Sequence, residues 1–319
     1  MNKDSKIFVT GHKGLVGSAV VRELTKQGYT NILTADKYEC NLLFAGDVGA
    51  YFDGNKPDYV INCAGKVGGV HANDIYSADF IRDNLIMQTN IIRVSHVYKV
   101  KKLMILGSSC IYPKLCPQPI KEEYLLSGPL EETNIGYAIA KIAGLTMCRM
   151  YSKQYGCDFI SAMPTNLYGI NDNFNLEESH VLPALIRKFH DAKVNNVGSV
   201  ELWGTGSPRR EFLFVDDLAE ALIFLMNNYN NPKHINVGVG KDISIEELAS
   251  IIKQVVGFKG RILWNITYPD GTPRKLLDVS KINDLGWSAK TSLEEGIQKT
   301  YKWFVENYNS ISIKKRKRF

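Results

Sequence analysis

The glycine-rich segment Gly11-His-Lys-Gly14-Leu-Val-Gly17 constrains the fold more than any other part of this chain. It follows a short β-rich run at residues 6–10 and precedes a stretch in which apolar residues recur at helical spacing. Glycines at a strand-to-helix turn let backbone amides approach a phosphate, and the start of the helix adds partial positive charge. The sequence therefore predicts a dinucleotide-binding loop, with simple turn chemistry as the alternative.

Short apolar runs continue to alternate with helical patterns through the first half of the chain. Further β-rich runs occur at 31–35, 59–62, 103–106 and 159–163, and a long helical stretch at 137–155 precedes the last of them. Continuous apolar strands separated by helices are typical of a parallel sheet covered on both faces. We therefore predict an α/β fold with a Rossmann-type doubly wound parallel sheet in residues 1–165, which later segments are able to complete.

The second half of the chain has a different rhythm. Isolated strands at 199–203 and 261–266 lie among loops and helices, and Ser244 with Glu247 forms a capping-box pattern that predicts the start of one helix. We expect residues 166–313 to form a smaller α/β substrate-binding domain, with a cleft between the two domains. Residues 314–319 are then a basic tail, expected to be a solvated end of the chain.

Charge and composition exclude several classes of protein. The net charge is +6, but five of the 39 basic residues lie at 314–318, so the rest of the chain carries 34 basic against 33 acidic residues. A near-neutral body argues against a nucleic-acid partner. No stretch reaches the roughly 18 apolar residues of a membrane span, and no cleavable apolar segment follows the first residue. We expect a cytoplasmic protein with no membrane partner, whose six cysteines lack CxxC spacing and are reduced thiols rather than disulfides or a metal site.

Residues near the second predicted strand point to different dinucleotides. Asp36 ends that strand, where an acid binds the adenosine ribose hydroxyls and favours NAD. Lys13 in the glycine loop and Lys37 are cations that suit the 2′-phosphate of NADP, unless both are simply exposed. We expect NADPH as the cofactor, with NADH as the less favoured alternative.

A tyrosine and a lysine lie four residues apart at the start of the long predicted helix, as Tyr137 and Lys141. This spacing puts both side chains on one face, although such pairs are also common on helix surfaces. An ammonium near a phenol favours the phenolate, so the tyrosine can exchange a proton near neutral pH. Ser108 follows the 103–106 strand, at the edge where such sheets bind ligands. The three residues together predict a proton-transfer site.

With these motifs together, the chain resembles the extended short-chain dehydrogenase/reductases, whose signature is a glycine loop, a serine and a Tyr-xxx-Lys pair. The resemblance is closer to one group of that family, the GDP-L-fucose synthases, and runs from residue 6 to about 308. The segments that carry it are 66–70 (KVGGV), 107–114 (GSSCIYPK), 137–144 (YAIAKIAG), 164–169 (PTNLYG), 179–184 (SHVLPA), 210–213 (REFL) and 270–275 (DGTPRK).

The resemblance implies an enzyme that uses NADPH to reduce the 4-keto group of a GDP-linked sugar and that also epimerises carbons 3 and 5. The alternative is a 4-reductase without epimerase activity, acting on another GDP-4-keto sugar such as a GDP-heptose or GDP-6-deoxyheptose. A non-catalytic dinucleotide sensor on the same fold is a further interpretation, but a sensor has no chemical need for Ser108, Tyr137 and Lys141. A homodimer is also implied.

The resemblance assigns roles to individual residues. Ser108 and Tyr137 hold the oxygen of an enolate, Lys141 orients the cofactor ribose and keeps the pKa of Tyr137 low, and Cys110 and His180 form the acid–base pair of epimerisation. Taken alone, Cys110 also fits a small buried hydrophobe and His180 a helix cap. The cofactor residues implied are Gly11, His12, Lys13, Gly14, Leu15, Val16, Gly17, Lys37, Leu42, Ala64, Leu106, Gly107, Lys141, Pro164, Asn166, Leu167 and His180. The substrate residues implied are Lys188, Trp203, Arg210, Asp270 and Lys275.

The chain departs from the GDP-L-fucose synthase pattern in three places. Ile135-Gly136 replaces a Glu-Pro pair, Phe214 replaces a histidine, and the segment around 227–233 is short. A glycine in place of a proline is expected to loosen the loop that faces the sugar. We expect nucleotide binding and hydride transfer to be retained, while the identity of the sugar and the epimerisation stay open.

Overall fold

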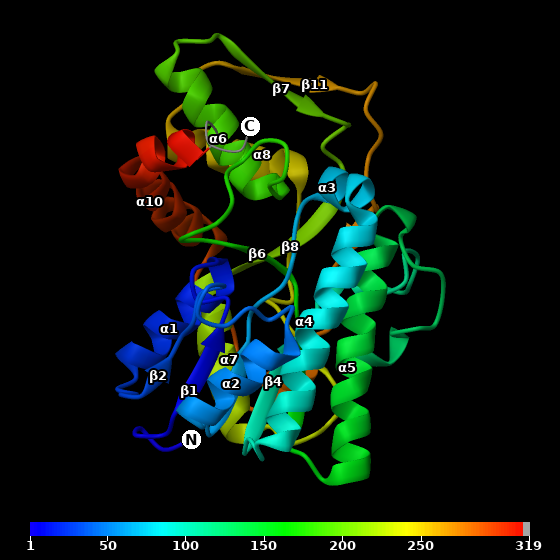
Figure 1. Ribbon diagram of the computed structural model, residues 1–319. Coiled ribbons are helices and arrows are strands. Elements are labelled where there is room, and N and C mark those ends of the chain that lie inside the picture. Colours follow the sequence, from blue (N-terminus) through cyan, green and yellow to red (C-terminus); the bar gives the residue numbers. More distant parts are fainter. Residues whose placement is uncertain (315–319) are drawn as a thin grey trace.

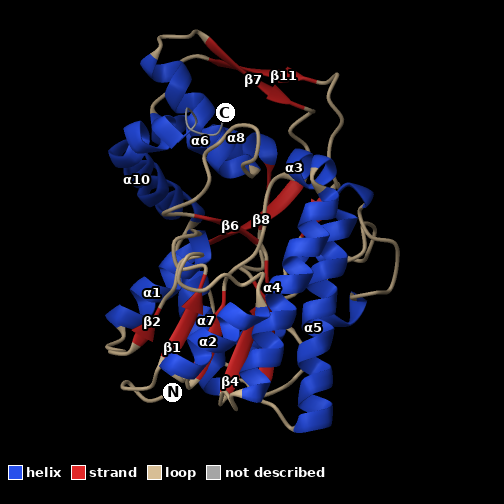
Figure 2. Cartoon of the chain, viewed as in Figure 1, coloured by secondary structure: helices blue, strands red, loops and turns tan. Residues whose placement is uncertain are grey.

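A six-stranded parallel sheet lies at the centre of the computed structural model, which describes residues 1–314 (Figures 1 and 2). Its strand order is β2-β1-β3-β4-β5-β9, so the chain crosses from one side of β1 to the other after β2. Ligands bind at such a switch point, at the carboxyl ends of the strands. The predicted doubly wound Rossmann-type sheet is confirmed. The strands are β1 (Ile7–Thr10), β2 (Ile32–Leu33), β3 (Tyr59–Asn62), β4 (Lys102–Leu106), β5 (Phe159–Pro164) and β9 (Ile235–Val237).

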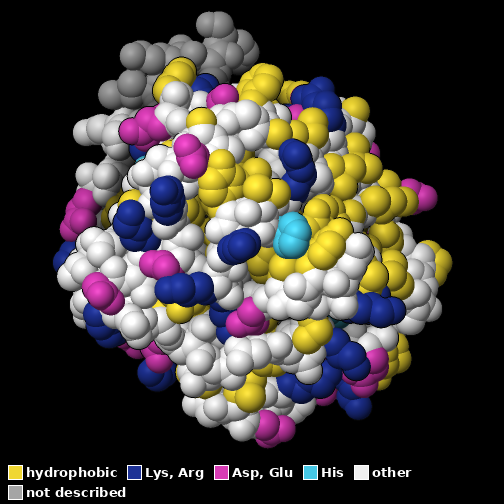
Figure 3. All heavy atoms as spheres, turned by 60° about the horizontal axis from the view of Figure 1, so that its bottom comes forward, with side chains coloured by type: hydrophobic (Ala, Val, Ile, Leu, Met, Phe, Trp, Pro, Cys, Tyr) yellow, Lys and Arg dark blue, Asp and Glu magenta, His cyan; other side chains and the backbone are white. Residues whose placement is uncertain are grey.

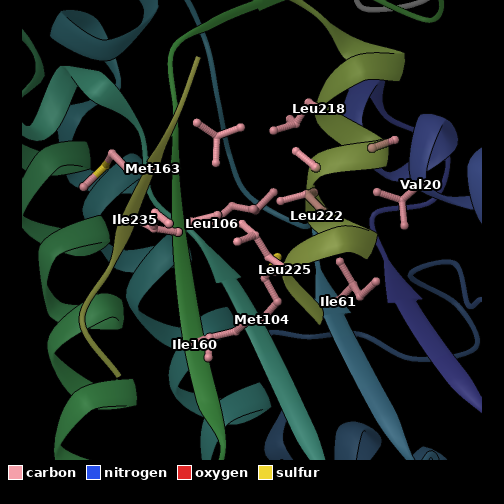
Figure 4. Close-up of a cluster of buried hydrophobic side chains, with 14 of the residues drawn as sticks. Val20, Ile61, Met104, Leu106, Ile160, Met163, Leu218, Leu222, Leu225 and Ile235 are labelled. Carbon is pink, nitrogen blue, oxygen red and sulfur yellow. The ribbon is translucent and has the colours of Figure 1, made fainter. Parts of the chain in front are cut away.

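Helices cover both faces of this sheet, because alternate strand residues point to opposite sides and both sets are apolar. On one face the strands pack against α1 and α7, and on the other against α2 and α4. Figure 4 shows the first face, where Leu218, Leu222 and Leu225 of α7 belong to one apolar cluster with Met104 and Ile160 of the strands and Leu225 lies beside Met104. The helices around the sheet are α1 (Leu15–Lys26), α2 (Ala45–Asn55), α4 (Ser77–Val97), α5 (Ile135–Tyr155) and α7 (Val215–Asn228), with α5 beside α4.

The rest of the chain packs at the carboxyl ends of these strands and has its own apolar core. A small sheet there has the order β10-β8-β12 with β6 also paired to β8, and β7 pairs with β11 at the far end of the molecule. Its strands are β6 (Asn166–Tyr168), β7 (Ser199–Trp203), β8 (Arg209–Phe214), β10 (Asp242–Ser244), β11 (Arg261–Asn265) and β12 (Arg274–Lys275). Its main helices are α6 (Val181–Val194), α8 (Ile245–Val256) and α10 (Leu293–Lys314), and the short helices α3 (Val70–Ile75) and α9 (Ser280–Asp284) complete the chain.

Local sequence signals explain several of these boundaries. The capping box predicted at Ser244 is present, because Ser244 Oγ accepts the Glu247 N–H at 3.1 Å and Glu247 Oε2 accepts the Ser244 N–H at 2.8 Å. The strand predicted at 31–35 is shorter than expected, since only Ile32 and Leu33 pair, at the edge of the sheet with a single neighbouring strand.

Later segments complete the first sheet, because β9 and α7 come from beyond residue 165. The division of the chain at residue 165 therefore stays a prediction.

On the face drawn in Figure 3, basic side chains are interspersed with acidic and apolar ones. None of the helices within residues 1–314 is long and apolar enough to cross a membrane. Of the predicted basic tail, Lys314 is the last residue of α10 and 315–319 lie outside the described residues.

Candidate active site

The glycine loop lies against the end of β3, and two of its glycines have no room for a side chain. Gly11 has a left-handed φ of +64°, and a Cβ there would lie 2.9 Å from the backbone nitrogen of Ala64. A Cβ on Gly17 would collide with the carbonyl oxygen of Gly11. Gly14 is the N-cap of α1 and donates its N–H to Gly11 O at 2.9 Å. The start of α1, free of side chains on this side, fits the pyrophosphate of a dinucleotide.

Asp36, which favours NAD, lies with Lys13 and Lys37, which favour NADP, at the predicted adenosine end of this loop. The Lys13 ammonium pairs with Asp36 Oδ2, and Asp36 Oδ1 accepts the Tyr38 N–H at 2.9 Å. The Tyr38 N–H and the Lys13 ammonium hold the pKa of Asp36 below its usual value. Lys37 lies over the ring of Tyr38, 5.1 Å from its centroid. Both oxygens of the Asp36 carboxylate are therefore engaged within the protein, and two cations stand beside them.

Ser108, Cys110 and Tyr137 meet at the carboxyl end of β4. Ser108 caps the 3₁₀ turn Ser109–Ile111, and this turn brings Cys110 Sγ to 3.1 Å from Ser108 Oγ. Tyr137 is buried in one apolar cluster with Cys110, and its phenol lies near the Ser108 side chain. Burial raises the pKa of the Tyr137 phenol well above its usual value. The phenol therefore keeps its proton at neutral pH and can donate it to a developing oxygen anion.

Lys141 lies one helical turn beyond Tyr137, as the spacing predicts. Its Nζ donates to the carbonyl oxygen of Leu106 at 3.0 Å and lies 5.7 Å from the centroid of the Tyr137 ring. Burial lowers the pKa of Lys141 to about 8. The expectation that Lys141 keeps the pKa of Tyr137 low is wrong for this structure, because the loss of water around the phenol is the dominant effect.

Close contact with α4 fixes the start of α5. A Cβ on Gly136 would lie 2.9 Å from the Ser77 carbonyl oxygen, and a Cβ on Gly144 would collide with the Gln88 side chain. Gln88 in turn donates its amide to the Ala140 carbonyl. Gly136 was expected to loosen the loop before Tyr137, but here its missing side chain lets the two helices approach each other. The departure at this position is therefore a packing feature.

His180 stands on a different wall of the site, as the N-cap of α6. The segment before it contacts the 66–70 segment, where the Gly69 N–H donates to Glu178 O at 2.8 Å. His180 is an exposed residue, yet the protein atoms crowded around its ring lower its pKa below the usual value. The imidazole is therefore neutral near pH 7 and can accept a proton.

Two predicted substrate residues form a cationic pair. Arg210 of β8 and Lys275 of β12 are register partners on adjacent parallel strands. Burial lowers the pKa of each, and Lys275 also lies within electrostatic range of Cys110. Neither cation forms an ion pair with an acidic side chain among residues 1–314. Partly desolvated, unpaired cations of this kind suit a diphosphate.

The other predicted substrate residues lie further out, around β7 and β11. Trp203 is 62 % exposed and stacks on Tyr268, with ring centroids 4.4 Å apart. Lys188 lies over the Trp203 ring at 5.3 Å. Asp270 accepts the Thr205 N–H at 2.9 Å and the Thr205 hydroxyl at 2.6 Å, so its carboxylate fastens the 204–207 turn. An exposed aromatic pair with a cation beside it forms a platform for a flat ring.

The remaining predicted cofactor residues line the carboxyl edge of the sheet. Ala64 follows β3 and donates its N–H to Thr10 Oγ1 at 3.1 Å, and Asn166 donates its amide to Glu211 O at 2.7 Å. A Cβ on Gly107 would lie 2.8 Å from Met163 Sδ, so a larger residue there requires the Met163 side chain to shift. His12, Leu15, Val16, Leu42, Leu106, Pro164 and Leu167 lie at or beside the same edge.

Comparison with known proteins also indicates a dinucleotide-binding enzyme fold. The family model described as "NAD dependent epimerase/dehydratase family" matches residues 7–238. The chain belongs to this family. It is 56 % identical over 306 residues to a GDP-L-fucose synthase of Arabidopsis thaliana, covering 96 % of this chain and 95 % of that protein. It is 50 % identical over 311 residues to the GDP-L-fucose synthase of Escherichia coli, covering 95 % of this chain and 97 % of that protein.

Among solved structures, the chain is similar to a GDP-mannoheptose C4 reductase from Campylobacter jejuni with NADP bound. The two share 40 % identity with a TM-score of 0.87, over 96 % of this chain and 99 % of the other. The family, its extended short-chain dehydrogenase/reductase fold and its use of a nicotinamide dinucleotide are thus as the sequence predicted.

The second departure from the GDP-L-fucose synthase pattern, Phe214, is also explained by packing. Phe214, where a histidine was expected, is 2 % exposed and packs against Tyr168, with ring centroids 5.7 Å apart. It belongs to the apolar core that includes α6, α8 and α10. A phenyl ring suits this place, and the substitution does not alter the polar groups of the site.

Sequence reasoning missed Glu211 and Tyr268. Glu211 is fully buried, and its carboxylate accepts N–H groups from Val239 at 2.6 Å, Gly240 at 2.7 Å and Leu277 at 3.0 Å. It thereby ties the strand of Arg210 to the segment that follows Lys275. An acid directly before the apolar run 212–215 was the available signal for Glu211. Tyr268 gave no signal, because its partner Trp203 is 65 residues away in the chain.

Proposed function

We propose that this chain is an NADPH-dependent enzyme that epimerises carbons 3 and 5 of GDP-4-keto-6-deoxymannose and reduces its 4-keto group. The observation that carries the proposal is the Ser108 hydroxyl, which lies 3.1 Å from the Cys110 thiol and near the Tyr137 phenol. A proton-transfer group and two oxyanion donors thus share one side of the candidate site. High identity to GDP-L-fucose synthases along nearly the whole chain supports the same reaction.

The residues of the site account for the epimerisation. A 4-keto group acidifies the hydrogens on the two neighbouring carbons, and removal of either gives an enolate. Ser108 and Tyr137 donate hydrogen bonds to its oxygen. Cys110 and His180 take a proton from one face of the ring and return one to the other face, which inverts the carbon. Repeating the exchange at the second carbon completes the inversion.

Tyr137 then serves the reduction. NADPH, when bound, supplies the hydride that reaches carbon 4. The oxygen at that carbon takes up negative charge, and the Tyr137 phenol, protonated because burial raises its pKa, donates the proton that completes the alcohol. The Lys141 ammonium, held at Leu106 O, binds the ribose next to the nicotinamide.

Binding of the GDP portion falls to the rest of the cleft. The cationic pair Arg210 and Lys275 binds the diphosphate. The stacked Trp203 and Tyr268, with Lys188 beside them, bind the guanosine. Asp270 acts on this region through the Thr205 turn that it holds.

NADPH rather than NADH is the proposed cofactor. The carboxylate oxygens of Asp36 accept from Lys13 and the Tyr38 N–H, so the acid that would bind ribose hydroxyls already holds a cation beside it. Lys13 and Lys37 supply positive charge where a 2′-phosphate would lie. The NADP in the related heptose reductase supports the same choice.

The test is product analysis. The purified protein is incubated with NADPH and GDP-4-keto-6-deoxymannose, NADPH oxidation is followed by absorbance, and the product is identified by NMR. We expect stoichiometric NADPH oxidation and a product inverted at carbons 3 and 5. No oxidation of NADPH with this sugar or with a GDP-4-keto-heptose would contradict the proposed function.

A second candidate is a 4-reductase that acts on a GDP-heptose and depends on a separate epimerase. Similarity to the Campylobacter jejuni C4 reductase favours it. The same NMR analysis separates the two. The second candidate predicts a reduced sugar with the configuration of its substrate at carbons 3 and 5, and faster turnover of the heptose.

We also propose a homodimer formed through α4 and α5, which lie side by side at one edge of the molecule (Figure 1). Their outer surface exposes Ile86, Ile135, Ile139 and Met150. Apolar residues on an uncovered helix pair favour a second copy of the same face. Light scattering should give twice the chain mass, and Ile139→Glu should shift it towards the monomer.

A further inference from the structure

The short helix α3 connects two parts of the candidate site. In the middle of the helix, Ala72 belongs to the apolar cluster that contains Tyr137 and against which Cys110 packs. At the start of the helix, its N-cap Gly69 contacts the segment that leads into His180. The turn 65–69 and α3 therefore lie between the cluster against which Cys110 packs and the segment that leads into His180.

Gly69 is a glycine because of space, not because of backbone conformation. Its φ of −65° is one that any residue adopts. A Cβ at this position would lie 2.9 Å from the Ser179 carbonyl oxygen and 3.4 Å from the Glu178 carbonyl oxygen. Both are backbone atoms and cannot rotate away as a side chain does. Any side chain at Gly69 must displace residues 178 and 179, and with them His180.

The turn that carries Gly69 is itself held firmly. Asn73 is 7 % exposed, and its amide nitrogen donates to Gly68 O at 2.8 Å and to Gly69 O at 3.0 Å. A Cβ on Gly68 would lie 3.0 Å from the Ala72 Cβ and 3.2 Å from Phe80 Cζ. Because the turn is pinned on both sides, a strain at Gly69 is relieved by movement of the His180 segment and not of the turn.

We propose that Gly69 is a positioning residue for epimerisation: its bare backbone lets residues 178 and 179 dock on α3 and so sets the distance from His180 to Cys110. The inference rests on the proposed function, and specifically on His180 and Cys110 working from different sides of the sugar. Gly69 touches no reacting atom. Hydride transfer to carbon 4 and its proton from Tyr137 use the other wall of the site.

The test measures exchange and reduction separately. GDP-4-keto-6-deoxymannose is incubated in D₂O with the protein and NADP⁺, and deuterium entering carbons 3 and 5 is followed by NMR. In parallel, NADPH oxidation reports reduction. Gly69→Ala is compared with the unaltered protein and with Gly46→Ala, a control in α2 where an added Cβ meets nothing within 4 Å. Asn73→Asp, which replaces the donor to the Gly68 and Gly69 carbonyls by an oxygen, perturbs the same turn without adding bulk.

We expect the rate of deuterium exchange to fall about tenfold or more in Gly69→Ala, since displacements of an ångström or less misalign acid–base groups strongly. NADPH oxidation should continue and give an unlabelled product. Asn73→Asp should change the ratio of exchange to reduction in the same direction, and it decides the matter if Gly69→Ala does not fold. Unchanged exchange, or equal losses of exchange and reduction, would overturn the inference. Absence of exchange in the unaltered protein would instead overturn the proposed epimerase function.

Discussion

Lys13 Nζ lies 3.3 Å from Asp36 Oδ2 at the adenosine end of the glycine loop, with 72 % of the Lys13 side chain exposed. An ion pair this exposed contributes little to stability because water screens it. A 2′-phosphate, with more negative charge than one carboxylate, can therefore draw the Lys13 ammonium away from Asp36 at little cost. Asp36, which would favour NAD, and Lys13, which would favour NADP, are thus paired with each other in this structure.

Replacing Lys13 and Lys37 by alanine should weaken the preference for NADPH. A charge-assisted hydrogen bond is worth roughly 1.5–3 kcal/mol, and only NADPH offers the phosphate. We expect KM for NADPH to rise on the order of tenfold, with KM for NADH little changed, in steady-state assays. The exposed Lys259→Ala serves as control. An unaltered preference would return the choice to Asp36 and NADH.

Tyr137→Phe should remove the proton donor for carbon 4 while leaving the helix intact. General acid catalysis contributes on the order of 100-fold or more, so kcat should fall by that factor, with NADPH affinity unchanged. Titration of NADPH fluorescence and stopped-flow rates separate the two effects. Tyr155→Phe is the matched control, because Tyr155 lies at the far end of the same helix and is exposed. A near-normal rate in Tyr137→Phe would mean that another group protonates the alkoxide.

The lowered pKa of Lys141, about 8, predicts opposite trends in activity and stability. Cofactor binding needs the ammonium, so kcat/KM should fall as pH rises through 8. In the unfolded chain Lys141 binds its proton up to its usual pKa of about 10.5, so the free energy of unfolding gains a contribution between pH 8 and 10.5. Lys141→Met should lack this gain in denaturant titrations. A pH-independent kcat/KM from 7 to 9 would contradict the role of Lys141.

Asp172 predicts a stability effect of the reverse sign. Burial raises the pKa of its carboxyl to about 7, and Oδ2 makes no hydrogen bond within residues 1–314. Between pH 4 and 7 the unfolded chain releases this proton while the folded chain keeps it, so stability falls as pH rises. Asp172→Asn should raise Tm by about 2–4 °C at pH 8 and little at pH 4.5. Equal shifts at both pH values would show that the carboxyl does not titrate in this way.

Sequence patterns predicted the elements that depend on local chemistry. The glycine loop, the Tyr137–Lys141 helix and the capping box at Ser244 are specified by residues close together in the chain, so their positions follow from spacing alone. Strand β2 is shorter than its apolar run because pairing at the edge of a sheet depends on the neighbouring strand.

Features that depend on distant contacts were not predictable from one sequence. The pKa of Tyr137 is set by burial under residues from several elements, and the role of Gly136 by the position of α4. Asp270 holds Thr205, 65 residues away, so its carboxylate is engaged within the protein. In each case the residue type indicated the chemistry, but only the tertiary packing determines its partner.

The central claim is that Cys110 and His180 invert carbons 3 and 5 of the sugar in the same site where Tyr137 completes its reduction. The most direct test is turnover of GDP-4-keto-6-deoxymannose in D₂O with NADPH. Epimerisation passes through an enolate that takes its new protons from solvent-exchanged groups, whereas direct reduction never breaks those C–H bonds. We predict deuterium at carbons 3 and 5 of the product. Cys110→Ser should suppress it while 4-keto reduction persists, because a hydroxyl is a far weaker base than a thiolate. A product of the unaltered protein without deuterium at either carbon would contradict the epimerase function and leave a 4-reductase in which Cys110 only lines the pocket.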